Sequence, residues 1–293
     1  MARVIVVGSA NVDHVWRGAV LPAPGETVTD GEYVRVFGGK GANQAAATAR
    51  LGAEAYLVGC VGADELGDSV RADLVGRGVD CSHLSRAPTA STGVALIMVD
   101  ARGENMIAVA PGANRQLGSE AAVAAVETLA RPGDVVLACL ELEVDVVGVA
   151  LAAARRRGAT TVLNPAPVRP GIERLIAECS VVVPNEHEAT RLGGTDALLG
   201  QGAGAVVVTL GARGALLGRA GAPDVAVAGF AVDALDTTGA GDACCGALAW
   251  SLAAGAPLEV AVRRACAAGA LACRAVGARE AQATASEVIA LAG

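Results

Sequence analysis

The hydrophobic positions of the chain fall into short apolar runs separated by stretches with helical spacing. Strand-like runs occur at Val4–Val7, Ala55–Cys60, Val94–Val99, Met106–Val109, Val135–Ala138, Thr160–Leu163, Val181–Val183, Ala205–Thr209 and Val225–Val232. Helical patterns lie at about 41–51, 66–77, 119–130, 144–157, 186–192, 239–254 and 257–276. Short, continuously apolar strands that alternate with helices predict an α/β fold with a doubly wound, mainly parallel sheet flanked by helices.

Two segments interrupt this alternation. Residues 11–38 carry "LPAPGETV" but no convincing helix, and residues 90–112 resemble two strands around "DARGEN". Together they predict a small β-sheet that stands off the main sheet. We find no repeat, low-complexity tract or long linker, so we expect one domain over 1–293, with a lid formed by about 11–38 and 90–112.

The composition narrows the class of protein. Hydrophobic residues make up 53% and charged residues 18% of the 293 residues, which is typical of a globular protein. The net charge of −7 argues against nucleic-acid binding, which needs clustered basic side chains. No apolar run is long enough for a membrane span, and the N-terminus resembles a first strand rather than a signal peptide. We therefore expect a cytoplasmic protein.

The cysteines and the single lysine also bear on function. None of the eight cysteines forms a C-x-x-C pair, and most lie in apolar stretches, so we interpret them as small buried hydrophobes. Of the 23 basic residues, 22 are arginine and only Lys40 is lysine. A lone lysine against that background suggests a local requirement for it.

Polar side chains follow the first predicted strand in "GSANVDH". Asn11 and Asp13 are two residues apart, so an extended chain directs both to the same side. An amide and a carboxylate on one face suit the hydroxyl groups of a polyol. An Asx-turn that closes the strand explains the same residues equally well.

A glycine cluster surrounds Lys40 in "FGGKGANQ". Gly38, Gly39 and Gly41 allow backbone to approach a ligand, and Asn43 lies in the first turn of the following helix. The stretch is not a Walker A loop, because Gly41 stands where that motif has serine or threonine. A glycine-rich helix entry is also a common structural device.

A third polar cluster, "PNEHEA", follows the strand at 181–183. Asn185, Glu186 and Glu188 crowd the start of a helix, where acidic residues are stabilising in any case. Asparagine and glutamate oxygens can also hold hydrated Mg²⁺ beside a phosphate. The next strand ends near Thr209 and Gly211, a position compatible with lining a nucleotide.

The fourth cluster is "DTTGAGDACCGALAW", residues 236–250. It fails the dinucleotide-binding fingerprint, because the third glycine would be residue 244, which is cysteine. The backbone amides of Gly239 to Asp242 would point at an anion from a helix N-terminus. Asp242 is an ordinary helix-start residue, but a carboxylate beside an anion site also suits a general base in phosphoryl transfer.

Taken together, these clusters resemble the ribokinase (PfkB) family of carbohydrate kinases over nearly the whole chain. "GGKGANQA" is similar to the N-terminal signature of the family and "DTTGAGDACCGAL" to its C-terminal signature, with "NPAP" (164–167) and "PNEHEA" (184–189) in order between them. The resemblance implies an ATP-dependent sugar kinase that uses Mg²⁺ and a monovalent cation such as K⁺. It also implies a homodimer formed through the lid.

The resemblance also implies roles for individual residues. Sugar binding falls to Asn11, Asp13, Gly39, Lys40, Asn43 and Glu141; catalysis to Asp242 as general base, with Gly239, Ala240 and Gly241 as anion hole; ATP to Asn185, Thr209, Gly211, Gly241 and Cys266; Mg²⁺ to Glu188, through water; and the monovalent cation to Asp236, Thr238, Ala272 and Gly277.

Two departures from the family pattern bear on the substrate and the cation. Ala281 stands where ribokinases usually carry a cation-site serine, which puts K⁺ activation in doubt. Trp16 is unusual for a ribose site, and with Phe37 it offers an apolar wall for a nucleobase. We expect ribose as substrate, with another sugar (fructose, 2-keto-3-deoxygluconate) or a nucleoside as alternatives and a non-catalytic sugar sensor as a remote one. An oxidoreductase fails on the glycine spacing.

Overall fold

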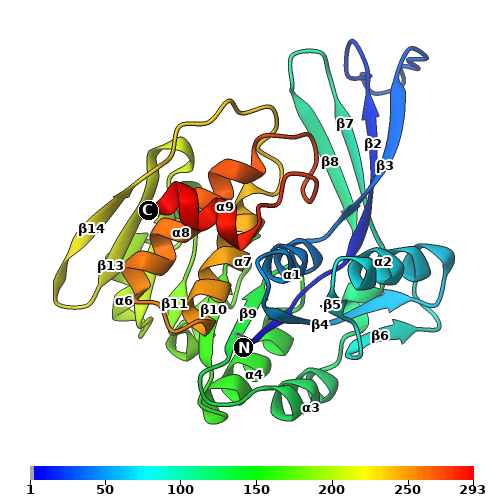
Figure 1. Ribbon diagram of the computed structural model, residues 1–293. Helices are drawn as coiled ribbons and strands as arrows, with labels where there is room; N and C mark the ends of the chain where they lie inside the picture. Colours follow the sequence, from blue (N-terminus) through cyan, green and yellow to red (C-terminus); the bar gives the residue numbers. More distant parts are fainter. Residues whose placement is uncertain (1–2) are drawn as a thin grey trace.

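The computed structural model describes residues 3–293 (Figure 1). Its strands are β1 Arg3–Val7, β2 Asn11–Arg17, β3 Glu32–Gly38, β4 Glu54–Gly62, β5 Val79–Asp80, β6 Leu84–Ala87, β7 Gly93–Val99, β8 Asn105–Ala110, β9 Val135–Cys139, β10 Thr160–Asn164, β11 Val181–Val182, β12 Ala205–Thr209, β13 Gly214–Arg219 and β14 Ala222–Ala228. Its α-helices are α1 Lys40–Arg50, α2 Glu65–Gly76, α3 Ser119–Leu129, α4 Val144–Arg156, α5 Glu186–Arg191, α6 Gly194–Gly200, α7 Ala240–Ala253, α8 Leu258–Ala272 and α9 Ala285–Ala292.

The main sheet has the order β14-β13-β12-β11-β10-β9-β1-β4-β5, with β6 also paired to β4. It is parallel from β12 to β5, and only β13 and β14 add antiparallel strands at one edge. The chain leaves β1 for β4 on one side and later returns to β9 on the other. The strand order therefore reverses beside β1, and ligands of open α/β sheets bind at such a point.

Helices cover both faces of this sheet, as its continuously apolar strands require. One buried cluster joins Val4 and Val6 of β1 to helices α1, α2, α7, α8 and α9. A second joins Ile5 and Val7 to helices α3, α4, α5 and α6. Alternate side chains of one strand thus enter opposite layers, and the predicted doubly wound fold is confirmed.

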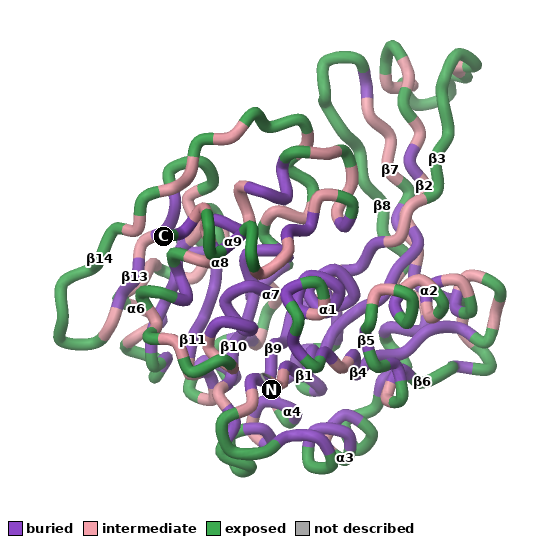
Figure 2. The backbone as a smooth tube through the Cα atoms, viewed as in Figure 1, coloured by how far each residue is buried: buried purple, intermediate pink, exposed green. Residues whose placement is uncertain are grey.

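The lid is a separate four-stranded sheet with the order β3-β2-β7-β8, which projects from the main body in Figure 1. Strand β2 lies at its centre, antiparallel to β3 and parallel to β7. All six residues of β8 are exposed. The burial colouring of Figure 2 shows the contrast between this largely exposed projection and the buried central strands.

Several predicted boundaries are wrong. The strand predicted at 225–232 is β14, which ends at Ala228, and residues 229–239 form an irregular segment before α7. The helix predicted to run to 276 ends at Ala272. Helix α9 was not predicted, although Thr284 and Glu287 form a capping box at its start.

No helix within the described range 3–293 has both the length and the apolar character needed to cross a membrane.

Candidate active site

Two helices begin side by side at the carboxyl edge of the main sheet and bring the glycine cluster to the fourth polar cluster. Helix α1 begins at Lys40 after Gly39, and α7 begins at Ala240 after Gly239. Both N-cap glycines have positive φ, 86° and 77°, a conformation that a side chain disfavours. Two helix N-termini, each of which carries partial positive charge and favours anions, therefore meet at one place.

The start of α1 lies directly on the backbone that follows β1. A Cβ on Gly41 would lie 2.5 Å from the Cα of Gly8, and one on Gly39 would lie 2.7 Å from the amide nitrogen of Asn11. No side chain fits between these segments. The glycines predicted to admit a ligand thus also allow the helix to touch the strand end.

Asp242 is buried in the first turn of α7 and accepts two amide hydrogen bonds from α1. Asn43 Nδ2 donates to Oδ2 at 2.9 Å, and Gln44 Nε2 donates to Oδ1 at 3.1 Å. Burial raises the pKa of Asp242, against the nearby Lys40 ammonium and the two amide donors. The result is an ionisable carboxyl with a raised pKa, held by groups that donate to its charged form, which are properties of a general base.

Lys40 and Glu141 complete the charges around Asp242. The carboxylates of Asp242 and Glu141 raise the pKa of Lys40, so it stays protonated. Glu141 Oε2 accepts the Lys40 backbone amide at 3.0 Å and a short hydrogen bond from the Ser9 hydroxyl. Glu141, which follows β9, therefore ties the start of α1 to the loop after β1.

Asn11 and Asp13 come from β2 at the base of the lid. Asn114 donates from Nδ2 to Asn11 Oδ1 at 2.7 Å and accepts the Ala10 amide at Oδ1. Burial and the carboxylates of Glu141 and Asp242 raise the pKa of Asp13 to about 6, against the influence of Arg279. Asp13 thus lies close enough to Glu141 and Asp242 to respond to their charges, and Asn11 is held by Asn114.

The anion hole predicted at 239–241 lies at the start of α7, with one difference. The amide of Ala240 already donates to the Thr237 carbonyl at 3.2 Å, so its N–H does not face an anion. The amides of Gly241 and Asp242 belong to the first helical turn, and the first helical hydrogen bond is donated after them, by Ala243 to the Gly239 carbonyl at 2.9 Å. Of the amides predicted to form the anion hole, that of Gly241 is therefore without a backbone acceptor, as is the Asp242 amide, whereas that of Ala240 has one.

The polar residues of the third cluster, "PNEHEA", form hydrogen bonds with one another. Asn185 caps α5 by accepting the Glu188 amide at 2.8 Å, and Glu188 accepts the Asn185 amide at 2.9 Å, which is a capping box. Burial raises the pKa of Glu188. Asn185 also forms a bridge with Thr209, and Gly211 is exposed at the end of β12. Cys266 is half-buried in α8.

The predicted cation residues lie around Asp236. Its carboxylate accepts the Thr238 amide and the Gly277 amide, each at 2.9 Å. Burial acts against ionisation, but these hydrogen bonds prevail and lower the pKa of Asp236. Ala272 ends α8, one residue before Cys273, whose carbonyl accepts the Asp236 amide.

Trp16 and Phe37 do not lie on the face of the lid that carries Asn11 and Asp13. In the β2–β3 pair, Trp16 lies opposite Tyr33 and Phe37 opposite Val12, so both belong to the face opposite Asn11 and Asp13. Phe37 packs on the core, and the Trp16 ring covers Gly18 and Gly31. The apolar wall expected for a nucleobase is therefore not built from these residues.

Sequence reasoning missed five polar residues that hold the others: Ser9, Gln44, Asn114, Asn164 and Arg279. Ser9, Gln44 and Asn164 lie inside quoted motifs, and Gln44 donates to Asn164 Oδ1 at 3.2 Å. No pattern indicated Asn114 or Arg279, because their partners lie more than 100 residues away in the sequence.

Similarity to known proteins identifies the family of this chain. The model of the pfkB family of carbohydrate kinases matches residues 1–285. The ribokinase of Haemophilus influenzae is 38% identical over 251 residues, 81% of each chain. A ribokinase structure from Thermotoga maritima has a TM-score of 0.90 at 30% identity and covers 99% of both chains. The ribokinase of Arabidopsis thaliana, solved with ribose and ATP, has a TM-score of 0.88 at 28% identity and covers 99% of this chain and 98% of its own.

The chain belongs to the pfkB family of carbohydrate kinases, and it is a sugar kinase.

Proposed function

We propose that this chain transfers the γ-phosphoryl group of ATP to ribose, with ribose 5-phosphate as product. The observation that carries the proposal is the buried Asp242 carboxylate, held by Asn43 and Gln44 where helix α7 begins. Relatives that are named ribokinases support ribose as the sugar, and the Arabidopsis structure with ribose and ATP supports both ligands. The chain acts as one kinase domain, with the β2, β3, β7 and β8 sheet as lid.

Asp242 removes the proton from the attacking hydroxyl. Lys40, which stays protonated, offsets negative charge as the phosphoryl group arrives, and the Gly241 and Asp242 amides face the phosphate oxygens. Asn11, Asp13, Asn43 and Glu141, with Gly39, position the sugar hydroxyls. Asn185, Thr209, Gly211 and Cys266 lie along the nucleotide.

The residues present fit the two implied cations. Within residues 3–293 no cluster of three or more metal-ligating side chains occurs, so Mg²⁺ would be held by Glu188, through water, and by the phosphates. This ion supplies charge neutralisation on the phosphates when bound. The Asp236 carboxylate and the backbone at Thr238, Ala272 and Gly277 suit a monovalent cation such as K⁺, although Ala281 contributes no hydroxyl oxygen.

The lid provides the surface for a homodimer. Its exposed apolar side chains, each more than two-fifths exposed, lie on both faces: Val34, Ile107 and Val109 on the face of Asn11 and Asp13, and Tyr33, Leu96 and Met106 on the other. A second copy of the lid packed on one of these faces would cover its apolar side chains, since exposed apolar patches mark interaction surfaces. The free thiols of all eight cysteines are consistent with the cytoplasm, the compartment we propose.

An ADP-release assay over pentoses, hexoses and nucleosides, with and without K⁺, tests the substrate. We expect ribose to give the highest kcat/KM. Turnover of adenosine or inosine without turnover of any sugar would overturn the proposal. Preference for fructose or 2-keto-3-deoxygluconate would keep the kinase but change its substrate.

A further inference from the structure

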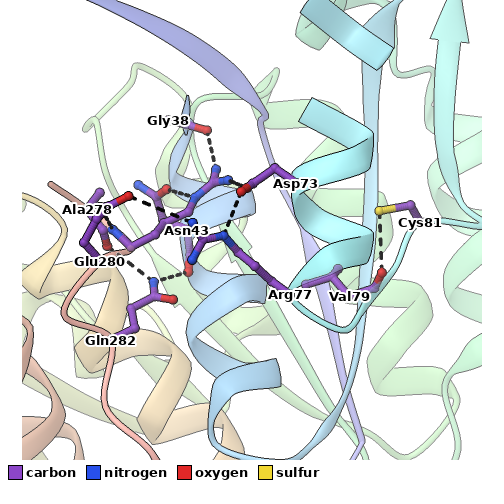
Figure 3. Close-up of polar contacts among 10 residues, drawn as sticks. Gly38, Asn43, Asp73, Arg77, Val79, Cys81, Ala278, Glu280 and Gln282 are labelled. Atoms are coloured by element: carbon purple, nitrogen blue, oxygen red, sulfur yellow. Dashed lines mark hydrogen bonds and ion pairs between the residues drawn. The ribbon is translucent and has the colours of Figure 1, made fainter. Parts of the chain in front are cut away.

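Arg279 is an arginine buried in the interior of the protein, only 3% exposed, in the segment between Gly277 and helix α9. Its guanidinium donates from Nε to Asn43 Oδ1 at 2.8 Å, from Nη2 to the Gly38 carbonyl at 2.8 Å, and from Nη1 to Asp73 Oδ2 at 2.5 Å. Figure 3 shows these partners converging from separate elements. One side chain thus joins helix α2, the end of β3, helix α1 and the C-terminal segment.

The charge of Arg279 is matched by Asp73, which also pairs at 2.9 Å with Arg77, the C-cap residue of α2. A buried charge is costly unless it is paired and hydrogen-bonded, and here each end of the guanidinium has an acceptor. Because Asp73 has a second cationic partner, removal of Arg279 does not leave that carboxylate unpaired.

The contact with Arg279 determines which way the amide of Asn43 faces. Arginine only donates hydrogen bonds, so the Asn43 atom beside it is the carbonyl oxygen, and Nδ2 must face the other way. That nitrogen donates to Asp242 Oδ2 at 2.9 Å. Gln282 further fixes Asn43 by donating to its backbone carbonyl at 3.0 Å.

We propose that Arg279 is a positioning residue, which locks the Asn43 side chain in the orientation that donates to Asp242. Through its bond to the Gly38 carbonyl, Arg279 also holds the base of the lid beside Asn43. The proposal rests on the function proposed for Asp242. Arg279 itself touches neither the phosphate-facing amides nor Asp242, so its effect on the base passes through Asn43.

Loss of Arg279 changes the environment of Asp242 in one direction. The charged groups around this carboxyl are Lys40 from α1, Glu141 from the loop after β9 and Asp13 from β2. Without the guanidinium, the Asn43 amide is free to turn its oxygen toward Asp242. A carbonyl oxygen at that place favours the protonated carboxyl, which cannot accept a proton from a hydroxyl.

The test is the titration of Asp242 in sugar-free protein, followed by NMR of ¹³C-labelled aspartate carboxyls and assigned through loss of the signal in Asp242→Asn. We expect Arg279→Met to raise the pKa of Asp242 by about one unit. Arg77→Met is the matched control, because it removes a cationic partner of Asp73 but leaves the Asn43 contact; it should leave the titration unchanged. An equal titration in both variants would overturn the proposal.

The kinetic readout separates this proposal from the proposed function. Arg279→Met should move the acid limb of the kcat profile up by about one pH unit, so that kcat falls about tenfold at pH values below the pKa of Asp242. Arg279→Lys, which keeps the charge but cannot hold three acceptors, should give a smaller shift and serves if the methionine variant does not fold. The NMR shift without sugar kinase activity in the wild type would support the positioning role and sink the proposed function. A lowered kcat with an unmoved acid limb and unmoved NMR titration would leave Arg279 a merely structural residue and overturn the proposal.

Discussion

The residues proposed to bind the sugar form hydrogen bonds with partners far away in the sequence. Those proposed to bind the nucleotide form hydrogen bonds with residues that are close in the sequence. Asn43 and Asp242, 199 positions apart, are buried and share a hydrogen bond. Asn185 and Glu188, three positions apart, form a capping box on an exposed helix start.

This contrast indicates how the two ligands are selected. A preassembled set of buried donors and acceptors discriminates strongly against a ligand that leaves any of them unpaired. An exposed helix start holds phosphate charge with less demand on shape. We therefore expect substitutions on the sugar side to change chemistry and specificity, and those on the nucleotide side to change mainly cofactor requirements.

The largest expected effect is that of Asp242→Asn. We expect kcat to fall by at least ~10²-fold with ATP affinity largely intact, because the substitution removes the proton acceptor but retains the shape of the side chain. Steady-state kinetics, together with calorimetric titration of ATP, check this. Turnover near that of the wild type would remove Asp242 from the role of base and weaken the contrast between the two sides.

A smaller effect is expected from the ionisation of Asp13, whose pKa is raised to about 6. Below that pH the protonated carboxyl loses acceptor capacity, so kcat/KM for the sugar should fall, approaching about tenfold per pH unit. The profile should be measured between about pH 5 and pH 8 in the wild type and in Asp13→Asn, which should lack this limb. A wild-type profile that stays flat through pH 6 contradicts the prediction.

The same pKa predicts the pH dependence of stability in the absence of sugar. The folded protein binds the Asp13 proton more tightly than the unfolded chain, whose aspartate pKa is about 3.9. The free energy of unfolding therefore contains a contribution that is present below about pH 4 and lost as pH rises through 6. Asp13→Asn should be the more stable protein at pH 7, by up to about 2 kcal/mol in urea unfolding.

The smallest effect is expected on the nucleotide side. Glu188→Gln keeps a side chain that completes a capping box but removes the negative charge proposed to hold hydrated Mg²⁺. The Mg²⁺ concentration for half-maximal activity should rise about fivefold, as expected for loss of about 1 kcal/mol from a half-buried charge, while the melting temperature stays unchanged. A large fall in melting temperature without a change in Mg²⁺ requirement would assign Glu188 to helix capping alone.

The sequence predicted what periodicity and local motifs can carry. The apolar runs placed the strands of the main sheet, and the glycines on either side of Lys40 and before Asp242 marked where α1 and α7 begin. The irregular segment 229–239 was misassigned because Val225–Val232 is continuously apolar, although only its first part pairs with β13.

The remaining parts depend on tertiary contacts that no local pattern records. The long-range partner of Asn43, Arg279, lies 236 positions away, and nothing around either residue indicates the other. The face on which Trp16 lies depends on the pairing register of β2 with β3, which the sequence alone left undefined. The Ala240 amide donates to the Thr237 carbonyl within a turn, and the composition of the segment does not predict that turn.

The contact between Gly8 and Gly41 has a consequence for anyone who redesigns this enzyme for another acceptor. Because a Cβ on either glycine would lie 2.5 Å from the backbone of the other, neither position accepts a larger residue. Glycine is already the smallest residue, so no substitution at this contact can make more room for a larger acceptor. Libraries for altered specificity should instead vary the lid strand β7, where Ala95 and Ile97 lie on the same face as Asn11 and Asp13. New acceptors would then be admitted by substitutions in the lid rather than at the contact between Gly8 and Gly41.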